Sequence, residues 1–397
     1  MGLSKSASLP DWRLFLAGSC LFAAGALTAG LFGPSNKSDI YRSPRATLLP
    51  RLSDAEKGQL PYPPDALPGA RDVDTPYGSI RVYEFGPEDG RKVLLVHGIS
   101  TPALALGAVA NALVDNGCRV MLFDLFGRGY SDTANDVRHD IRLFTTQILL
   151  VLASSPLSWT GKASGKFCLV GYSLGGGIAT TFTSYFADLV DSLVLFAPAG
   201  LLRPYHISRQ SRIIYSEGII PEPILRRIVK ARLRTPLAAP PPPPKGGVEE
   251  TRKVDATQAV QAEVPIESNS RAILSQTRPH VTVEKAVIHQ LDNHPGFVPA
   301  FISSIRYGPV RTEHDRWRIV GERLRQQNAA EGTRKKVLIV LGAKDPIIVR
   351  QEIEEDATAL LGGENVEFAV FDAAHDVPVV MGSQVVDSIL DFWKRTD

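Results

Sequence analysis

A serine stands between two glycines in the pattern Gly171-x-Ser173-x-Gly175, and a serine hydroxyl in such a turn is a candidate nucleophile. The apolar run Phe167 to Val170 predicts a buried strand before it, and the small residues Gly175 to Ala179 predict the start of a helix after it. Glycines two residues to either side of the serine remove Cβ atoms that would collide in the strained turn. The turn would also aim the first helix amides at the serine oxygen, where they stabilise an oxyanion. The pattern therefore predicts attack by Ser173 on a carbonyl carbon, although an isolated turn serine can also be purely structural.

Apolar runs of strand length alternate with helical patterns along the chain, which predicts a mainly parallel sheet with helices on both faces. A parallel sheet binds its ligand at the carboxyl ends of its strands, and several of these runs end in glycine-containing turns there. The run 79–85 alternates apolar and polar residues, as expected of a half-exposed edge strand. The other expected strands are 92–96, 119–123, 167–170, 192–197, 335–341 and 366–371, and the expected helices of the first half are 103–114 and 138–153.

Three motifs follow one another along the chain: His97-Gly98, the turn Asp124-x-x-Gly127-Arg128-Gly129-x-Ser131-Asp132, and Gly171-x-Ser173-x-Gly175. Their order resembles the α/β-hydrolases, and most closely their esterases, lipases and non-haem haloperoxidases. The resemblance implies the α/β-hydrolase fold, with an acidic residue after a later strand and a histidine after the last one.

Asp345 and His375 follow the last two apolar runs, in the chain order Ser, Asp, His that the resemblance implies. In this reading His375 takes the proton of Ser173, and Asp345 fixes the imidazole tautomer and stabilises its charged form. Asp372 and Asp376 flank the histidine and are alternatives for the acid. They rank lower because neighbours on a tight loop rarely point at the same imidazole.

The resemblance also implies an oxyanion hole made of the backbone amides of Leu174 and Ile99. The second donor is the less defined of the two, because Gly98-Ile99-Ser100 is not a run of three glycines. The remaining motif residues are expected to order loops and turns: His97, Gly98, Asp124 and Arg128.

Composition excludes several other classes of protein. The 397 residues are 44% hydrophobic and 22% charged, and a formal charge of +2 favours neither nucleic acid nor acidic substrates as partners. Cys20, Cys118 and Cys168 show no metal or disulfide spacing. His289 and His294 are close in sequence, but Asn293 and Pro295 predict a turn there and the two do not form a paired-ligand pattern. We therefore expect no metal, no organic cofactor and no nucleic-acid partner.

The amino end contains an uncharged apolar stretch, Leu14 to Phe32. As a helix it would measure about 28 Å, close to the ~30 Å hydrocarbon core of a bilayer. A retained single-pass anchor over residues 1–33 is favoured over a signal peptide cleaved near Ala24-Gly25-Ala26, which would release a secreted protein. Prolines recur over residues 34–70, which predicts a linker or wrapping arm, with folding from about Asp72.

Residues 71–200 and 336–397 are expected to form the α/β-hydrolase core, and residues 201–335 a cap or lid over the nucleophile. Within the cap, Glu222 to Leu233 predicts an amphipathic helix with one basic side. That side is either a solvated face or a membrane-facing lid. The Pro-rich segment around residues 235–268 is expected to be extended and disordered.

These features together predict a membrane-anchored serine hydrolase that cleaves carboxylic esters, with lipid esters among the candidate substrates. The acyl-enzyme chemistry would use Ser173, His375 and Asp345. The same triad could act on amides or thioesters. From another class, the chain could be a catalytically silent member of the fold that serves as a membrane scaffold.

Overall fold

The structure is a computed structural model that describes residues 40–160, 165–203, 205, 209–234, 272–275 and 277–396. The chain divides into two units, Met1–Asp39 and Ile40–Asp397, and only the second contains described residues. The predicted membrane anchor, the predicted Pro-rich segment around residues 235–268 and Cys20 lie outside the described residues. Within the described part of the chain, no helix combines the length and the apolar character needed to cross a bilayer.

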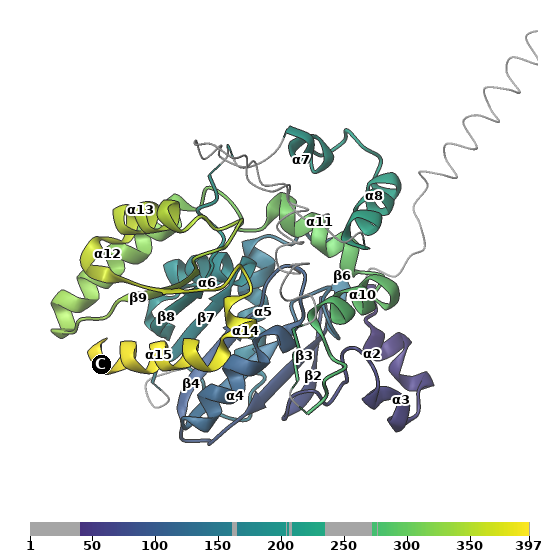
Figure 1. The fold of residues 1–397 in the computed structure, drawn as a ribbon, viewed down its shortest axis with the longest axis horizontal. Helices are drawn as coiled ribbons and strands as arrows, with labels where there is room; N and C mark the ends of the chain where they lie inside the picture. The colour runs from purple at the N-terminus through teal and green to yellow at the C-terminus, as the bar shows by residue number, and fades with distance from the viewer. Residues whose placement is uncertain are drawn as a thin grey trace, which may run out of the picture. The chain divides into compact units, whose positions relative to one another are not determined.

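An eight-stranded sheet, in the order β10-β9-β8-β7-β4-β5-β3-β2, forms the centre of the described chain (Figure 1). The pairs β2–β3 and β3–β5 are antiparallel and all other pairs are parallel, which confirms the expected mainly parallel sheet. The chain passes from β4 to β5 on one side and then returns to β7 on the other, so the strand order reverses at β4. The carboxyl ends of β4 and β7 therefore flank the crevice where such sheets bind ligands. The strands are β2 (Ala70–Thr75), β3 (Gly78–Phe85), β4 (Arg91–Val96), β5 (Cys118–Phe123), β7 (Phe167–Tyr172), β8 (Val190–Phe196), β9 (Val337–Gly342) and β10 (Val366–Phe371).

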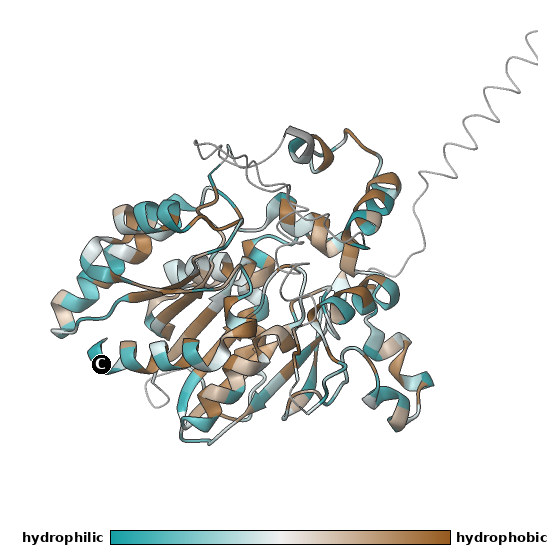
Figure 2. Cartoon of the chain, in the orientation of Figure 1, coloured by the Kyte–Doolittle hydropathy of each residue, from teal (hydrophilic) through white to brown (hydrophobic). Residues whose placement is uncertain are grey.

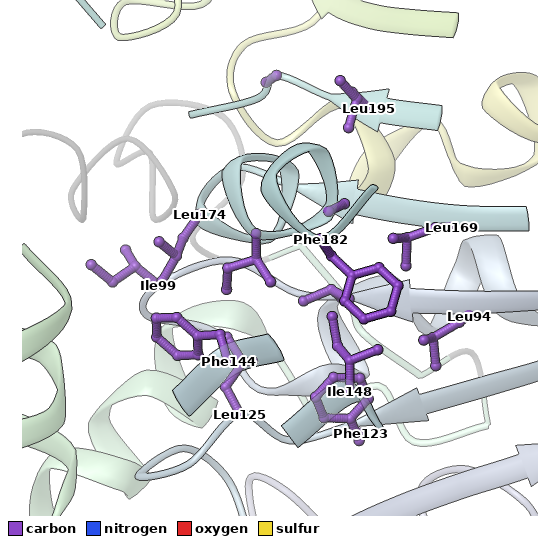
Figure 3. Packing of buried hydrophobic residues seen from close by; sticks show 14 of the residues in the cluster. Leu94, Ile99, Phe123, Leu125, Phe144, Ile148, Leu169, Leu174, Phe182 and Leu195 are labelled. Atoms are coloured by element: carbon purple, nitrogen blue, oxygen red, sulfur yellow. The ribbon is translucent and has the colours of Figure 1, made fainter. Parts of the chain in front are cut away.

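Apolar side chains cover both faces of this sheet, as a doubly wound fold requires. Val93 and Leu95 of β4 belong to one hydrophobic cluster, and Leu94 and Val96 belong to the other. Figure 3 shows the second cluster, in which side chains of the sheet meet Phe144 of α5 and Phe182 of α6. In Figure 2 the central strands are hydrophobic along most of their length, whereas α13 is mostly hydrophilic. The helices and short 3-10 turns of this core are η2 (Ala103–Leu106), α4 (Gly107–Asp115), α5 (Ile141–Ala153), α6 (Leu174–Tyr185), η3 (Ala187–Leu189), α12 (His314–Glu331), α13 (Arg350–Leu361), η5 (Gly363–Asn365), α14 (Val377–Val380) and α15 (Gly382–Thr396).

The prediction that residues 79–85 form a half-exposed edge strand is wrong. All eight residues of β3 are buried, and the edge is β2, whose residues are intermediate or exposed. The charged residues of β3 can be buried because charged residues of the neighbouring strands pair with them. Arg81 Nε donates to Asp72 Oδ1 over 2.7 Å, and Glu84 pairs with Arg71 at 3.0 Å and with Arg119 at 3.3 Å.

Of the two interpretations of residues 34–70, the linker with folding from about Asp72 does not fit the described part, because the chain is folded from Ile40 onward, whereas a wrapping arm does fit it. Ser43 N donates to Asp132 Oδ1 over 2.7 Å, and the buried Tyr62 ring stacks on Tyr130 with centroids 4.8 Å apart. These partners lie about 60 to 90 residues away on the turn after β5. Pro44 and Pro50 lie in the first turns of two of the short helices of the segment. Its elements are β1 (Ile40–Tyr41), which pairs with β6 (Thr133–Ala134), then α2 (Pro44–Thr47), η1 (Leu49–Arg51) and α3 (Asp54–Gly58).

The insertion after β8 contains helices that do not belong to the layers beside the sheet. The predicted amphipathic helix is α8, in which Leu225 and Val229 are buried while Ile224 is 50% exposed. The predicted end of the cap at residue 335 is too late, because α12 packs on α6 and α13 and is part of the core. The described cap helices are α7 (Arg209–Ile214), α8 (Glu222–Arg234), α10 (Val283–Asn293) and α11 (Phe297–Tyr307).

Candidate active site

Ser173 occupies the predicted sharp turn between β7 and α6. Its backbone has φ +53° and ψ −117°, a conformation that costs energy for any residue other than glycine. A Cβ at Gly171 would lie 2.3 Å from the carbonyl oxygen of Gly175, and one at Gly175 would lie 2.1 Å from that of Val96. Both glycines are therefore required by close backbone approach, as the spacing predicted.

The structure brings His375 and Asp345 together with Ser173, from loops that follow three different strands. Ser173 Oγ lies 3.0 Å from His375 Nε2, and His375 Nδ1 lies 2.7 Å from Asp345 Oδ2. The histidine and aspartate side chains are each 1% exposed. The carboxylate can only accept, so Nδ1 carries the proton and the lone pair of Nε2 faces the serine hydroxyl.

Backbone amides hold Asp345 in this orientation. Its Oδ1 accepts from Ile347 N over 2.8 Å and from Ile348 N over 3.0 Å, which leaves Oδ2 for the imidazole. The alternative Asp372 is 78% exposed and pairs with Lys344 at 2.7 Å. The other alternative, Asp376, is buried and precedes α14. Of the three carboxylates, the structure places Asp345 against the imidazole.

The residues predicted to supply the oxyanion amides lie at the ends of adjacent strands. Leu174 is the first residue of α6, so its amide is among those that a helix leaves without an internal acceptor. Ile99 follows β4, which pairs with β7. The side chains of Ile99 and Leu174, both labelled in Figure 3, belong to one buried cluster.

His97 is fully buried beside this loop, and its two ring nitrogens both bind backbone groups. Nδ1 lies 2.8 Å from Gly98 O, and Nε2 accepts from Leu125 N over 2.8 Å. Burial, reinforced by the positive charge of Arg128, lowers the pKa of His97 to about 3. A neutral histidine with both nitrogens occupied orders the loop, which is the role the sequence analysis expected.

Asp124 collects hydrogen bonds from several segments and holds the turn after β5. It accepts from Ala103 N over 2.8 Å, from Tyr130 N over 2.9 Å and from Tyr62 Oη over 3.1 Å. Burial raises the pKa of Asp124 to about 6, although these hydrogen bonds act in the opposite direction. The carboxylate therefore joins the amino-terminal segment to the turn.

In the described residues no group of three or more His, Cys, Asp or Glu side chains could hold a metal ion. The two histidines considered as a pair have other partners. His294 Nε2 lies 2.8 Å from Ser131 O, and His289 Nδ1 lies 3.2 Å from Asn293 Nδ2. Burial lowers the pKa of each histidine to about 4.

Two buried side chains around the oxyanion loop have contacts that sequence reasoning did not reveal. Arg128, expected only to stabilise its own turn, also donates to Ile99 O over 3.1 Å and to Ser304 Oγ of α11 over 2.8 Å. Gln290 of α10 was not identified at all. A signal existed, because Gln290 continues the buried stripe of that helix, where an apolar residue is expected.

The sheet order and the strand–serine–helix turn define the α/β-hydrolase fold. Residues 87–234 match the family model described as serine aminopeptidase, S33. A "serine hydrolase-like protein" of Danio rerio is 27% identical over 131 residues, which cover 33% of this chain and 38% of that protein. The chain spans less than half the length of the curated relatives it matches.

Two solved structures share the fold at low sequence identity. A thermophilic esterase from Thermogutta terrifontis has a TM-score of 0.53 at 19% identity, with 82% of this chain and 98% of that chain covered. A bacterial membrane phospholipase A has a TM-score of 0.52 at 18% identity, with 96% and 98% covered. Together with the family match over residues 87–234, these likenesses show the α/β-hydrolase fold for this chain.

Proposed function

We propose that this protein is a serine hydrolase that cleaves carboxylic esters through an acyl-enzyme intermediate. The observation that carries the proposal is the 3.0 Å contact of Ser173 Oγ with His375 Nε2, backed by Asp345 at 2.7 Å. A serine hydroxyl is a weak nucleophile at neutral pH unless an adjacent base accepts its proton. Here Nε2 of His375 presents its lone pair to the serine hydroxyl, and Nδ1 is held by the buried carboxylate of Asp345.

In the proposed reaction, Ser173 Oγ attacks the ester carbonyl while its proton passes to His375 Nε2. The carbonyl oxygen becomes an oxyanion, which the amides of Leu174 and Ile99 stabilise. The imidazolium then protonates the leaving alkoxide as the carbon–oxygen bond breaks. Water, deprotonated by the same imidazole, attacks the acyl-enzyme, and Ser173 recovers its proton as the carboxylic acid leaves.

Activity-based labelling tests the serine directly. A fluorophosphonate should label the wild-type protein, and Ser173→Ala should abolish the labelling. A folded wild-type protein that reacts neither with the probe nor with esters would favour the alternative of a catalytically silent scaffold. Turnover of p-nitrophenyl and glycerol esters of graded chain length would then define the acyl preference.

Amide substrates are the second candidate, and the description of the matching family model, serine aminopeptidase, favours them. The same triad serves both reactions, because only the leaving group differs. Aminoacyl p-nitroanilides should be compared with p-nitrophenyl esters under the same conditions. A higher kcat/KM for the anilides would replace the ester proposal with a peptidase, and cleavage of acyl thioesters would identify a thioesterase.

Membrane attachment is part of the proposal. The uncharged stretch Leu14 to Phe32 supports a single-pass anchor. The cap supports contact with lipid, because Ile213, Ile219 and Ile224 are each at least half exposed near the basic helix α8. Resistance of the full chain to alkaline carbonate extraction would support an anchor. Recovery of a shortened, secreted chain would show that the stretch is a cleaved signal peptide.

A further inference from the structure

Three consecutive carbonyl groups of the loop after β4 are held by three different buried side chains. Gly98 O lies 2.8 Å from His97 Nδ1, Ile99 O accepts from Arg128 Nε over 3.1 Å, and Ser100 O accepts from Gln290 Nε2 over 2.9 Å. His97 belongs to the loop, Arg128 to the turn after β5, and Gln290 to the cap helix α10. All three side chains are fully buried. The loop therefore depends on contacts from both the core and the cap.

The orientation of the Gln290 amide is determined by its partners. Its Oε1 accepts from Gly129 N over 2.7 Å, and a backbone N–H can only donate. The amide nitrogen must then be the atom that faces Ser100 O. One side chain of the cap thus satisfies a carbonyl of the oxyanion loop and an amide of the turn after β5.

A second polar connection from the cap reaches the same loop through Arg128. Ser304 of α11 donates its hydroxyl proton to Ala300 O over 2.8 Å and uses its lone pair to accept from Arg128 Nη2 over 2.8 Å. Arg128 in turn donates to Ile99 O. Both connections are buried, so breaking either leaves a polar group without water to replace its partner.

We propose that Gln290 is a positioning residue for the oxyanion hole, through which the cap helix α10 determines the placement of the Ile99 amide. The proposal rests on the proposed function. In a trans peptide the C=O of one residue and the N–H of the next point in opposite directions, so the contact of His97 with Gly98 O orients the Ile99 amide directly. The hydrogen bonds to Ile99 O and Ser100 O fix the next two peptides of the loop, and Gln290 therefore acts on the Ile99 amide through the backbone that follows it. A donor displaced by about 1 Å can cost roughly 100-fold in rate.

The first test is Gln290→Met, which keeps a long side chain and removes both hydrogen bonds. We expect kcat to fall about 10- to 100-fold with little change in KM. Affinity for a trifluoromethyl ketone, whose adduct with Ser173 places an oxyanion in the hole, should fall by a similar factor.

Ser303→Ala is the matched control, because it too removes hydrogen bonding between the cap and the core, at a place where the partner is not the oxyanion loop. Ser303 Oγ of α11 accepts from His139 N over 2.9 Å, and within the described part of the chain no hydrogen bond joins Ser303 to the oxyanion loop. Its kcat and its affinity for the ketone should stay within about two-fold of wild type. If kcat and ketone affinity fall equally in Gln290→Met and Ser303→Ala, and follow only the decrease in melting temperature of each variant, the proposal is overturned.

Gln290→Glu keeps the test decisive should the methionine variant fail to fold. The protonated glutamic acid can donate to Ser100 O and accept from Gly129 N as glutamine does, whereas the carboxylate can only accept. The ratio of kcat in this variant to kcat in wild type should therefore rise as the pH is lowered. Arg128 and His97 are the ionisable groups bound to the same loop, and both are also present in the wild-type reference. A ratio that stays constant with pH would overturn the proposal.

Failure of this inference differs from failure of the proposed function. If a fluorophosphonate labels wild type and both Gln290 variants at the same rate, Gln290 does not position the hole, and the hydrolase proposal stands. If wild type itself is not labelled at Ser173, the hydrolase proposal fails first.

Discussion

Two buried histidines stand at the carboxyl edge of the sheet, one in the loop after β4 and one in the loop after β10. His97 and His375 are both at most 1% exposed, so burial does not distinguish them. Their partners do. His375 lies between a carboxylate and a serine hydroxyl, whereas His97 lies between a carbonyl and a backbone amide.

The difference in partners decides what each histidine can do with a proton. In the proposed reaction, the carboxylate at Nδ1 would stabilise the imidazolium that forms when His375 takes the serine proton. Both ring nitrogens of His97 bind backbone groups instead of a carboxylate, and the nearby positive charge of Arg128 opposes protonation. A buried histidine can therefore act as a base where a carboxylate binds its second nitrogen. A buried histidine with only neutral backbone partners stays neutral and supports the structure.

The largest effect should come from removing the imidazole that has the anion. His375→Ala should lower kcat by about 10⁶-fold, as loss of the histidine does in a comparable triad. Steady-state hydrolysis of a p-nitrophenyl ester measures the change, with circular dichroism as the check on folding. A variant that keeps more than about one hundredth of wild-type turnover would assign the base to another residue.

Asp345→Asn tests the anion itself. The amide can no longer orient and stabilise the imidazolium, so kcat should fall by about 10⁴-fold. The exposed Asp372→Asn is the matched control and should change kcat less than two-fold. Near-normal turnover in Asp345→Asn would transfer the acid role to Asp372 or Asp376, and the contrast between the two histidines would lose its basis.

Ile99→Pro tests the loop that His97 supports. Proline lacks the N–H that is proposed to bind the oxyanion, and removing one such donor costs about 10² to 10³ in kcat. Ile99→Val keeps the amide and most of the buried side chain, so it controls for packing. If the two variants lose the same activity, the amide of Ile99 is not an oxyanion donor.

The smallest expected effect is on stability at acidic pH, and it tests the state of His97 without any substrate. The pKa of His97 is about 3 in the folded chain and 6.5 as the ordinary value. The folded state therefore binds fewer protons than the unfolded state. The contribution of His97 to the free energy of unfolding is fully present above pH 6.5 and is lost as the pH drops toward 3. One such group costs about 1.4 kcal/mol per pH unit in that range.

His97→Gln should reduce this acid sensitivity, because a glutamine amide offers a donor and an acceptor but does not titrate. Urea unfolding at pH 7.5 and pH 5.5 should show a loss about 1.4 kcal/mol smaller than in wild type. His139, His289 and His294 have lowered pKa values as well and contribute the same sign in both proteins. An unchanged pH dependence would mean that His97 is not held neutral by the fold.

Local signals made most of the site predictable. Ser173, Asp345 and His375 each come directly after a strand, and apolar runs reveal strands well. The place of Gln290 in the buried stripe of its helix was a local signal, but its partner was not predictable, because the contact with Ser100 joins residues 190 positions apart. The strand β2 was missed for a related reason. Its charged edge residues show no apolar run, and only pairing with β3 defines it.

The amino-terminal segment shows the same limit in the opposite direction. Its prolines and polar residues predict a linker by composition, yet Ser43 and Tyr62 find buried partners on the turn after β5. Composition reports the lack of regular periodicity but carries no information on distant partners. The fold was therefore predictable where strands and helices alternate. It was not predictable where a segment without regular secondary structure is held in place by single polar contacts.

The bracing of the Ser173 turn limits where this protein can be recombined with its relatives. Ser173 N donates to Phe196 O over 2.9 Å, and Ser173 O accepts from Ala199 N over 2.9 Å. Gly200 then bonds to Val310 and Glu313, so both ends of the insertion are joined beside the nucleophile. A chimera that exchanges the cap should have its junctions between residues 201 and 309. A junction outside this range would replace residues whose backbone hydrogen bonds support the strained turn of Ser173.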